Sequence, residues 1–317
     1  MSLIDKNIII TGGNGFLGSY VVEYLKNLGV KNIYIVQHNI FDLIDLEDIR
    51  DMLHWHIEDN TILIHLAAFV GGIGLNQSKP AELFYKNLIM GVQLIDQAYK
   101  YGVEKFVTVG TVCSYPKFTP TPFKEEDLWN GYPEETNAPY GIAKKVLLTQ
   151  AQAYRKQYGF NIIYLIPVNL YGPRDNFNLE TSHVIPALIR KFVEARDNRD
   201  NFVTLWGDGS PTREFLYVED AARGICLATE KYNGEEPINL GTGYEISIRN
   251  LANFIADIVD YRGDVIWDTS KPNGQPRRAL DVTKAERYFG FKAQIDFKEG
   301  VTNTIKWYEE NKREIER

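Results

Sequence analysis

Cys113 stands just past an apolar run, 105–109, that we expect to form a buried strand. The carboxyl ends of parallel strands form the edge where open α/β sheets bind their ligands. An ionised thiol at that edge can act as a base or nucleophile, although cysteine is also among the residue types most often buried as packing. Cys113 is therefore either a reactive group or a core residue, whereas Cys226, within the apolar helical stretch AARGICLA, is expected to be core.

Tyr140 and Lys144 stand four positions apart on an expected helix, so their side chains share one face. A free tyrosine has a pKa of about 10, which is too high for acid–base work at neutral pH. A neighbouring ammonium stabilises the phenolate, so we expect Lys144 to lower the pKa of Tyr140. Tyr140 would then exchange a proton with a carbonyl or hydroxyl oxygen that the Thr111 hydroxyl orients. The alternative is an amphipathic surface pair.

A glycine-rich loop, Thr11-Gly-Gly-Asn-Gly-Phe-Leu-Gly18, joins an expected strand to an expected helix. Gly12 permits a tight turn, Gly15 lets a pyrophosphate approach the backbone, and Gly18 lets helix and strand pack closely. The phosphates would bind the free N–H groups at the helix N-terminus. This context predicts a dinucleotide site rather than a merely tight turn. The expected contacts from this loop are Gly12, Asn14, Gly15, Phe16, Leu17 and Gly18.

The residues after the second expected strand bear on which nicotinamide cofactor is bound. An acidic residue there usually binds the ribose hydroxyls of NAD, and a basic one the extra phosphate of NADP. No acidic residue lies between Gly29 and Phe41, so we predict NADP(H) without excluding NAD(H). His38 contacts that phosphate or faces solvent. Asp42 hydrogen-bonds the adenine amino group or is a surface acid.

Short apolar runs alternate with amphipathic stretches through the first half of the chain, which predicts an α/β fold with a doubly wound parallel Rossmann sheet. A smaller C-terminal α/β substrate domain is expected to follow. We assign residues 1–170 to the dinucleotide-binding domain, with strands returning from about 214–245, and 171–317 mostly to the substrate domain. Strands are expected at 7–11, 33–36, 61–66, 105–109, 161–166, 203–206 and 237–240, and helices at 15–28, 45–53, 81–101, 139–158, 182–196, 248–259 and 297–309.

The composition narrows the classes of partner and compartment. The chain has 317 residues, of which 44% are hydrophobic and 24% charged, as in ordinary globular proteins. Its net charge of −7 argues against nucleic acid as a partner, and no window approaches the ~20 apolar residues that span a membrane. The start, MSLIDKNIIITGG, lacks a signal-peptide pattern. Two cysteines predict neither a disulfide framework nor a zinc site, so we expect no metal and a reducing, cytoplasmic setting.

Several motifs resemble those of the extended short-chain dehydrogenase/reductase group. They are the glycine loop, Thr111, the Tyr140–Lys144 pair, HLAA at 65–68 and NLYGP at 169–173. Further stretches extend the resemblance to the GDP-L-fucose synthase family over nearly the whole chain. These stretches are HLAAFVGGI, VCSYPK, EETNAPYGIAKK, QYGFNIIYLIPVNLYGPRDNFN, SHVIPALIRKF, GDGSPTREFLYVED and DTSKPNGQPR.

The resemblance implies a bifunctional nucleotide-sugar enzyme. It would epimerise C3 and C5 of GDP-4-keto-6-deoxy-D-mannose and reduce C4 with NADPH, giving GDP-L-fucose, or act in the same way on a related GDP-4-keto sugar. Cys113 and His183 match the family's base and acid, which work on opposite faces of the sugar, and Tyr140 would deliver the proton during reduction. A histidine with its ordinary pKa of about 6.5 donates a proton readily at neutral pH. The family also forms homodimers through two helices.

The resemblance also implies binding positions. An arginine such as Arg213 suits bidentate contact with the phosphates of a GDP group. Trp206 stacks on a ring or is core, and Arg190, Arg277 and Arg278 are further cations of the second half that either bind phosphate or form a solvated face. The implied cofactor contacts are Leu66, Ala67, Ala68, Tyr140, Lys144, Pro167, Asn169, Leu170 and His183. The implied substrate contacts are Asn169, Lys191, Trp206, Arg213 and Lys271.

The chain departs from the family pattern in three ways. Thr111 replaces the usual serine, Asn14 replaces an arginine, and Val36 and Gln37 replace basic residues. These departures leave room for a relative that acts on another GDP-4-keto sugar, such as a 6-deoxy-heptose, and the last two weaken the NADP assignment. Two rival functions also stay open. One is an NAD-dependent nucleotide-sugar 4-epimerase. The other is a non-catalytic regulator that binds NADP, against which the intact Tyr140 and the other candidate catalytic residues argue.

Overall fold

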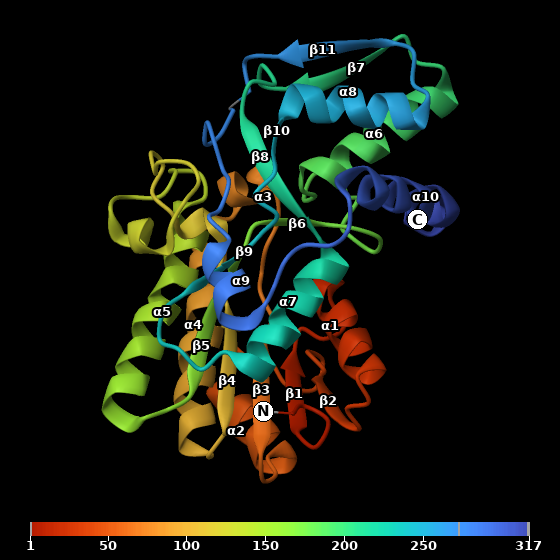
Figure 1. Ribbon diagram of the computed structural model, residues 1–317. Coiled ribbons are helices and arrows are strands. Elements are labelled where there is room, and N and C mark those ends of the chain that lie inside the picture. The colour runs from red at the N-terminus through yellow and green to blue at the C-terminus, as the bar shows by residue number, and fades with distance from the viewer. Residues whose placement is uncertain (1, 272, 316–317) are drawn as a thin grey trace.

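The computed structural model describes residues 2–271 and 273–315, so Pro272 of the DTSKPNGQPR motif lies outside the described residues. A six-stranded parallel sheet with the order β2-β1-β3-β4-β5-β9 forms its base (Figure 1). The strand order reverses direction between β1 and β3, and open α/β sheets bind ligands at such a switch point. The bounds are β1 Asn7–Thr11, β2 Asn32–Val36, β3 Thr61–His65, β4 Lys105–Val109, β5 Ile162–Pro167 and β9 Ile238–Leu240.

Helices cover both faces of this sheet (Figure 1). Helix α4 packs against α5, and α1 packs against α7. Because both faces are covered, β3, β4 and β5 are buried along their whole length and read as continuous apolar runs rather than alternating ones. The helices are α1 Phe16–Asn27, α2 Leu46–His56, α3 Ile73–Ser78, α4 Pro80–Lys100, α5 Ala138–Tyr158, α7 Val218–Lys231 and α9 Thr283–Phe289, with short 3₁₀ turns η1 Val112–Ser114 and η2 Glu125–Trp129.

A second group of elements lies beyond the carboxyl ends of the main strands, in the upper part of Figure 1. It contains a three-stranded sheet with the order β10-β8-β6 and a parallel pair of β11 and β7. A separate apolar cluster fills it, which includes Phe192, Leu251 and Tyr308. Its elements are β6 Asn169–Tyr171, α6 Val184–Asn198, β7 Phe202–Trp206, β8 Thr212–Tyr217, β10 Glu245–Ser247, α8 Ile248–Val259, β11 Asp264–Asp268 and α10 Phe297–Ile315.

The doubly wound α/β fold expected from the sequence is confirmed. Several expected boundaries are wrong. The helix expected at 45–53 ends at His56, the helix expected at 297–309 ends at Ile315, and the helix expected at 182–196 begins only at Val184. The N–H of Ser182 instead donates to the carbonyl oxygen of Asn178 at 2.8 Å, and the carbonyl oxygen of Thr181 accepts from Gly72 at 2.9 Å. These turn and loop contacts hold 181–182 against residues that follow β3, outside any helix. Among the described residues, no helix is long and apolar enough to cross a membrane.

A buried ammonium ties β4 to the end of α7. Lys105 is fully buried, and its Nζ donates to the carbonyl oxygens of Thr229 and Tyr232, the latter at 2.6 Å, and to the side-chain oxygen of Asn233 at 3.1 Å. The last carbonyls of a helix lack intrahelical partners and carry partial negative charge. Burial lowers the pKa of Lys105 to about 8. The lysine therefore supplies the missing donors for the end of α7.

We predict that Lys105→Met will lower the free energy of unfolding by about 3 kcal/mol, because it leaves buried carbonyl oxygens without donors. Urea unfolding followed by circular dichroism measures this change. Lys231→Met, at an exposed position on α7, is the matched control and should stay within about 0.5 kcal/mol of the parent protein. Equal effects of the two substitutions would contradict the assigned role of Lys105.

Candidate active site

One cavity of about 1760 Å³ lies between the carboxyl edge of the main sheet and the second group of elements. Residues of the glycine loop line one end of the cavity, and residues of β7, β8 and α6 line the other. Of the site residues expected from the sequence, Lys271 does not line it. The others do, and they are Gly12, Asn14, Gly15, Phe16, Leu17, Gly18, His38, Asp42, Leu66, Ala67, Ala68, Thr111, Cys113, Tyr140, Lys144, Pro167, Asn169, Leu170, His183, Lys191, Trp206 and Arg213.

The glycine loop has the geometry that close phosphate binding requires. Gly12 has a φ of +71°, and a Cβ there would lie 2.7 Å from the backbone nitrogen of Ala67. A Cβ at Gly18 would overlap the carbonyl oxygen of Gly12, so only glycine lets α1 begin this close to β1. Gly15 occupies the N-cap of α1 and offers no side-chain acceptor, which leaves N–H groups of the first turn free for an anion.

Polar but mostly uncharged groups line the cavity where β2 ends. The side-chain nitrogen of Asn14 donates to the side-chain oxygen of Gln37 at 3.0 Å. His38 is exposed and borders the cavity. The carboxylate of Asp42 accepts the N–H of Ile44 at 3.0 Å and is partly exposed beside the cavity, so it is a lining group as well as a loop acid.

Tyr140 is 8% exposed and hydrogen-bonds with the Thr111 side chain. Burial raises the pKa of Tyr140, the nearby Cys113 sulfur adds to the rise, and the hydrogen bond with Thr111 opposes it. Burial also lowers the pKa of Lys144 to about 8. The expectation that the pKa of Tyr140 is lowered is therefore wrong for the protein chain alone, because burial dominates and Lys144 is not among the groups that shift this pKa. Tyr140 keeps its proton at neutral pH.

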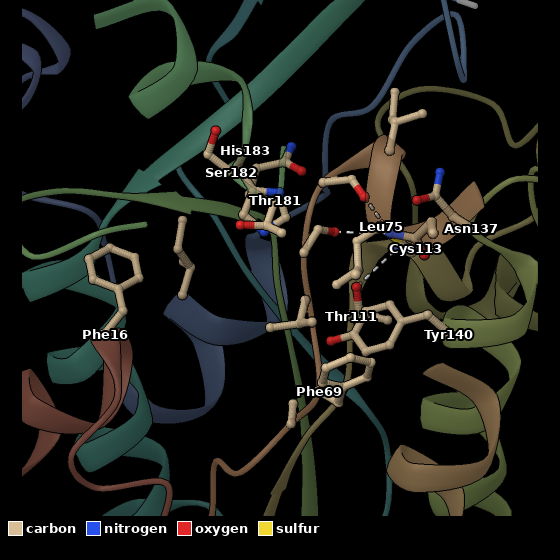
Figure 2. Close-up of a pocket in the computed structure, with 18 of the residues that line it drawn as sticks. Phe16, Phe69, Leu75, Thr111, Cys113, Asn137, Tyr140, Thr181, Ser182 and His183 are labelled. Carbon is tan, nitrogen blue, oxygen red and sulfur yellow. Dashed lines mark hydrogen bonds between the residues drawn. The ribbon is translucent and has the colours of Figure 1, made fainter. Parts of the chain in front are cut away.

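Cys113 and Tyr140 lie on the same side of the cavity, with Thr111 between β4 and η1 (Figure 2). The Thr111 hydroxyl oxygen accepts the N–H of Cys113 at 3.2 Å. The Cys113 side chain is partly exposed, and its Sγ lies 3.5 Å from Nη1 of Arg278. Cys113 is therefore not fully buried packing. Cys226, in contrast, is 1% exposed on α7, which confirms the expected core position.

His183 reaches the same cavity from the N-cap position of α6 (Figure 2). Its side chain is accessible within the cavity while protein surrounds it. This enclosure lowers the pKa of His183, and the positive charge of Arg278 lowers it further. The imidazole is consequently mostly neutral at pH 7, and the ready protonation expected from an ordinary histidine is reduced.

The far end of the cavity carries an indole ring and several cations. Trp206 is 49% exposed, which excludes the core alternative. Lys271 lies outside the lining but places its Nζ 5.4 Å from the centre of the Trp206 ring. Lys191 donates to the carbonyl oxygen of Thr204 at 3.0 Å. Burial lowers the pKa of Arg213, and the neighbouring charge of Arg278 lowers it further.

The remaining cations of the second half divide into two groups. Arg190 pairs with Glu194 at 2.7 Å, and Arg277 pairs with Glu245 at 2.5 Å, and neither arginine borders the cavity. Arg278, in contrast, borders the cavity.

Lining residues that the sequence reasoning missed include Asn76, Asn137, Asn273 and Gln275. Three of these missed residues lie in the quoted motifs EETNAPYGIAKK and DTSKPNGQPR, which was the available signal.

The donor set suits organic chemistry with a dinucleotide better than metal chemistry. Among the described residues, no group of three or more histidine, cysteine, aspartate or glutamate side chains is placed to hold a metal ion. The glycine loop fits a pyrophosphate, because a Cβ at Gly15 would meet nothing closer than the carbonyl oxygen of Gly12 at 3.2 Å, so the side facing the cavity is open.

Three comparisons connect this chain with known proteins. It is 40% identical over 312 residues to Probable GDP-L-fucose synthase 1 of Oryza sativa subsp. japonica, covering 98% of this chain and 94% of the relative. A GDP-6-OMe-4-keto-L-xylo-heptose reductase from C. jejuni superposes with a TM-score of 0.90 at 26% identity, covering 98% of this chain and 99% of that one. The NADP-bound GDP-L-fucose synthetase from Naegleria fowleri gives a TM-score of 0.86 at 30% identity, covering 98% and 95%.

Residues 8–241 match the model of the NAD dependent epimerase/dehydratase family. This segment contains the main sheet, the glycine loop and the lining residues Cys113, Tyr140, Lys144 and His183. The chain therefore belongs to the NAD dependent epimerase/dehydratase family and, within it, to the GDP-L-fucose synthases and their relatives.

Proposed function

We propose that this protein epimerises C3 and C5 of a GDP-linked 4-keto-6-deoxy sugar and then reduces C4 with NADPH. GDP-4-keto-6-deoxy-D-mannose is the proposed substrate and GDP-L-fucose the product. The observation that carries the proposal is the shared cavity, in which a thiol, an imidazole and a buried phenol all border one space beside a dinucleotide loop. A 4-epimerase would need no thiol and imidazole of this kind, and a non-catalytic binder would need none of the three groups.

The cofactor would lie along the carboxyl edge of the main sheet. When bound, NADPH supplies the hydride for C4. Its pyrophosphate would sit on the N-terminus of α1, and Tyr140 and Lys144 would lie beside its nicotinamide half. His38 and Asn14 would serve the adenosine phosphate in place of the basic residues usual in the family. The other proposed contacts are Gly12, Gly15, Phe16, Leu17, Gly18, Asp42, Leu66, Ala67, Ala68, Pro167, Asn169, Leu170 and His183.

The epimerisation follows from the acidity of carbon next to a ketone. The C4 carbonyl can accept the electron pair of a broken C3–H or C5–H bond, which gives an enolate. The Cys113 thiolate would take the proton on one face of the ring. The protonated form of His183, which its lowered pKa makes the minor form at pH 7, would return a proton on the other face. Thr111 and Tyr140 would hold the C4 oxygen by hydrogen bonds while negative charge develops on it.

The reduction uses the same phenol in a second role. Because burial raises the pKa of Tyr140, the hydroxyl is protonated at neutral pH and can give its proton to the C4 oxygen as hydride arrives. The nucleotide would extend toward the second group of elements. Arg213 would contact the phosphates, Trp206 would stack on a ring of the nucleotide, and Lys191, Asn169 and Lys271 would complete that end.

The proposed cofactor contacts and substrate contacts fall mainly in two different domains. We propose that 1–170, with segments returning from about 214–245, form the dinucleotide-binding domain, and that 171–317 mostly form the substrate domain. Two separate apolar clusters support this division: residues of α7 and α9 join the cluster of the main sheet, and the second cluster draws on Tyr171 and later residues. The free cysteines Cys113 and Cys226 fit a reducing cytoplasm.

We also propose a homodimer that forms through α4 and α5. These helices pack side by side and leave apolar side chains at the surface, with Tyr85 58% and Val146 36% exposed. Two such pairs would form a four-helix contact. Sedimentation at micromolar concentration measures the assembly state.

The activity is tested by adding 4-keto-6-deoxy sugars linked to GDP, UDP and dTDP and following the absorbance of NADPH. We expect oxidation of NADPH with the GDP-linked sugar and a product inverted at C3 and C5. A sugar that is converted without net NADPH oxidation would favour the 4-epimerase. No turnover of any sugar would favour the binding protein.

Cys113→Ser should reduce exchange of the C3 and C5 hydrogens with deuterated solvent by about 100-fold. A serine hydroxyl is a weaker acid than a thiol, so it is not ionised at neutral pH and cannot act as the base. Nuclear magnetic resonance of the recovered sugar measures the exchange. Binding of NADPH should persist, and Cys226→Ala is the control for loss of a thiol elsewhere. Exchange that survives in Cys113→Ser would remove the base from the proposal.

Tyr140→Phe should lower the rate of C4 reduction by about 100-fold, because the proton donor is lost. Stopped-flow absorbance of NADPH measures this step. Tyr158→Phe is a matched control on the same helix, since Tyr158 is 45% exposed. Reduction at the parental rate in Tyr140→Phe would show that another group supplies the proton.

Two glycine substitutions should separate folding from cofactor binding. Gly15→Ala creates a tight contact of 3.2 Å with the carbonyl oxygen of Gly12, which a shift of a few tenths of an ångström relieves, so we expect a loss of stability of no more than about 1 kcal/mol. Its NADPH affinity should fall at least about tenfold, because the methyl group occupies the space of the pyrophosphate. Gly18→Ala should instead destabilise the fold by about 2 kcal/mol through overlap with Gly12. Thermal unfolding and NADPH fluorescence titration distinguish the two, and parental affinity in Gly15→Ala would move the cofactor elsewhere.

A further inference from the structure

Arg278 contacts the thiol that the proposed chemistry requires. Its Nη1 lies 3.5 Å from the Sγ of Cys113. The residue is 6% exposed and borders the cavity. Cys113 and Arg278 are far apart in sequence and meet only in the folded chain. A contact of this kind between a guanidinium and sulfur is ordinary for a thiol and strongly favourable for a thiolate.

The segment 275–280, which we call the strap, holds Arg278 in place through its side chain. Nε of Arg278 donates to the side-chain oxygen of Gln275 at 3.1 Å. The side-chain nitrogen of Gln275 donates in turn to the carbonyl oxygens of Pro116 at 3.2 Å and Lys117 at 3.1 Å. These carbonyls belong to the loop that continues from Cys113. The strap and the cysteine loop are therefore connected directly.

The strap is also fixed by its backbone. The N–H of Glu214 in β8 donates to the carbonyl oxygen of Arg278 at 2.9 Å, and the N–H of Phe123 donates to that of Ala279 at 2.8 Å. The N–H of Leu280 donates to the buried carboxylate of Glu214 at 2.6 Å. Arg278 thus has a rigid backbone and a braced side chain, which is the condition for holding a charge at a chosen atom.

The charges around Cys113 are predominantly positive. Arg213 on β8 interacts electrostatically with Cys113, Arg278 and Glu134. Tyr140 on α5 faces the sulfur as a neutral phenol, and His183 at the start of α6 faces Arg278. Glu134 and Glu245 are the acids that act on Arg213. The carboxylate of Glu134 already accepts hydrogen bonds from Thr136 and Asn137, and that of Glu245 pairs with Arg277.

We propose that Arg278 is a positioning residue that holds Cys113 as a thiolate before substrate binds. A free cysteine thiol has a pKa of about 8.5 and is mostly protonated at neutral pH. A fixed cation in a partly enclosed site favours the ionised form. The proposal rests on the proposed function only for its consequence, because the state of the thiol is a property of the chain by itself.

The consequence is a base that is ready for the first step. The C3–H or C5–H bond breaks, its electron pair moves toward the C4 oxygen, and the proton forms the S–H bond of Cys113. Negative charge leaves the sulfur and appears on the enolate oxygen, so no oxidant or reductant is needed. Arg278 stabilises the state before this transfer, and the Thr111 and Tyr140 hydroxyls stabilise the state after it.

The competing assignment for Arg278 is direct contact with the substrate's diphosphate. The contact with sulfur and the brace from Gln275 favour the thiolate assignment, since both direct the guanidinium toward the cysteine loop. Arg277 provides a matched control. Arg277 is the neighbouring residue on the strap, but its guanidinium pairs with Glu245 outside the cavity.

The test is the rate at which iodoacetamide alkylates Cys113 in the full-length protein, measured by peptide mass spectrometry from pH 5 to pH 10. Only the thiolate reacts. In Arg278→Gln the rate at pH 7 should fall about tenfold, and the difference should close at high pH, where the thiol is ionised in both proteins. Arg277→Gln and the conservative Arg278→Lys should stay within about threefold of the parent. Cys226, at 1% exposure, is an internal reference for intact folding because its alkylation reports unfolding.

A pH–rate profile of Arg278→Gln that superposes on the parent profile would overturn the proposal. An unchanged profile with weakened GDP binding, measured by calorimetry, would assign Arg278 to the diphosphate instead. If alkylation of Cys226 shows that Arg278→Gln is partly unfolded, the proposal is tested with the parent protein alone. Its Cys113 should then react faster at pH 7 than N-acetylcysteine, and its rate should reach the high-pH plateau at a lower pH. A Cys113 no faster than N-acetylcysteine would refute the thiolate.

Failure of the function and failure of this inference are distinguishable. Absence of deuterium at C3 and C5 with the parent protein would refute the epimerase, whatever the alkylation profile shows. With an active parent, Arg278→Gln should slow deuterium incorporation about tenfold at pH 7, and raising the pH should restore it. A loss of incorporation that pH does not restore would indicate a structural role only.

Discussion

The chemistry of the cavity depends on the close approach of α5 to the turn that follows β4. A Cβ at Gly141 would overlap the carbonyl oxygen of Cys113, so the helix can lie on this turn only where a side chain is missing. The hydroxyl of Ser114 donates to the carbonyl oxygen of Gly141 at 2.8 Å and ties the two together. The next residue back on α5 is Tyr140, and the turn begins at Thr111. One backbone contact thereby sets the positions of the phenol, the hydroxyl and the thiol relative to one another.

A second constraint fixes the other wall of the cavity. The carboxylate of Glu214 is fully buried in β8 and accepts N–H groups from Thr242, from Gly243 at 2.8 Å and from Leu280 at 2.6 Å. Burial raises the pKa of Glu214, and these backbone donors oppose the rise. Residues 242–243 follow β9 of the main sheet, and Leu280 ends the strap. One carboxylate therefore joins the main sheet, the small sheet and the strap, which is why lining residues from both halves of the chain hold a common geometry.

Sequence patterns anticipated the elements that have a strong period and missed those that do not. The expected helix 248–259 matches α8, whose apolar stripe is marked, and the expected strand 105–109 matches β4. The three residues of β10 are too few to show alternation, and they become a strand only because β8 lies beside them. The charge state of Tyr140 was misjudged for a related reason. Helical spacing shows that Lys144 is near, but it does not show how deeply both groups are buried. The contact between Arg278 and Cys113 forms only when distant segments of the folded chain come together, so no local sequence pattern predicts it.

The distribution of charge explains how an acidic protein can select a doubly charged phosphate ligand. The chain as a whole carries a net charge of −7, yet the cavity is lined by Arg213, Arg278, Lys144 and Lys191. Burial and the neighbouring charge of Arg278 lower the pKa of Arg213, which means that the two cations are held together at an energetic cost. An anion beside the two cations removes part of that repulsion. Under the proposal for Arg278 this anion is the Cys113 thiolate, whose Sγ lies 3.5 Å from Nη1 of Arg278, and Arg213 is left to contact the diphosphate. Stabilisation of the proposed base and binding of the proposed substrate would then draw on neighbouring cations of one cavity.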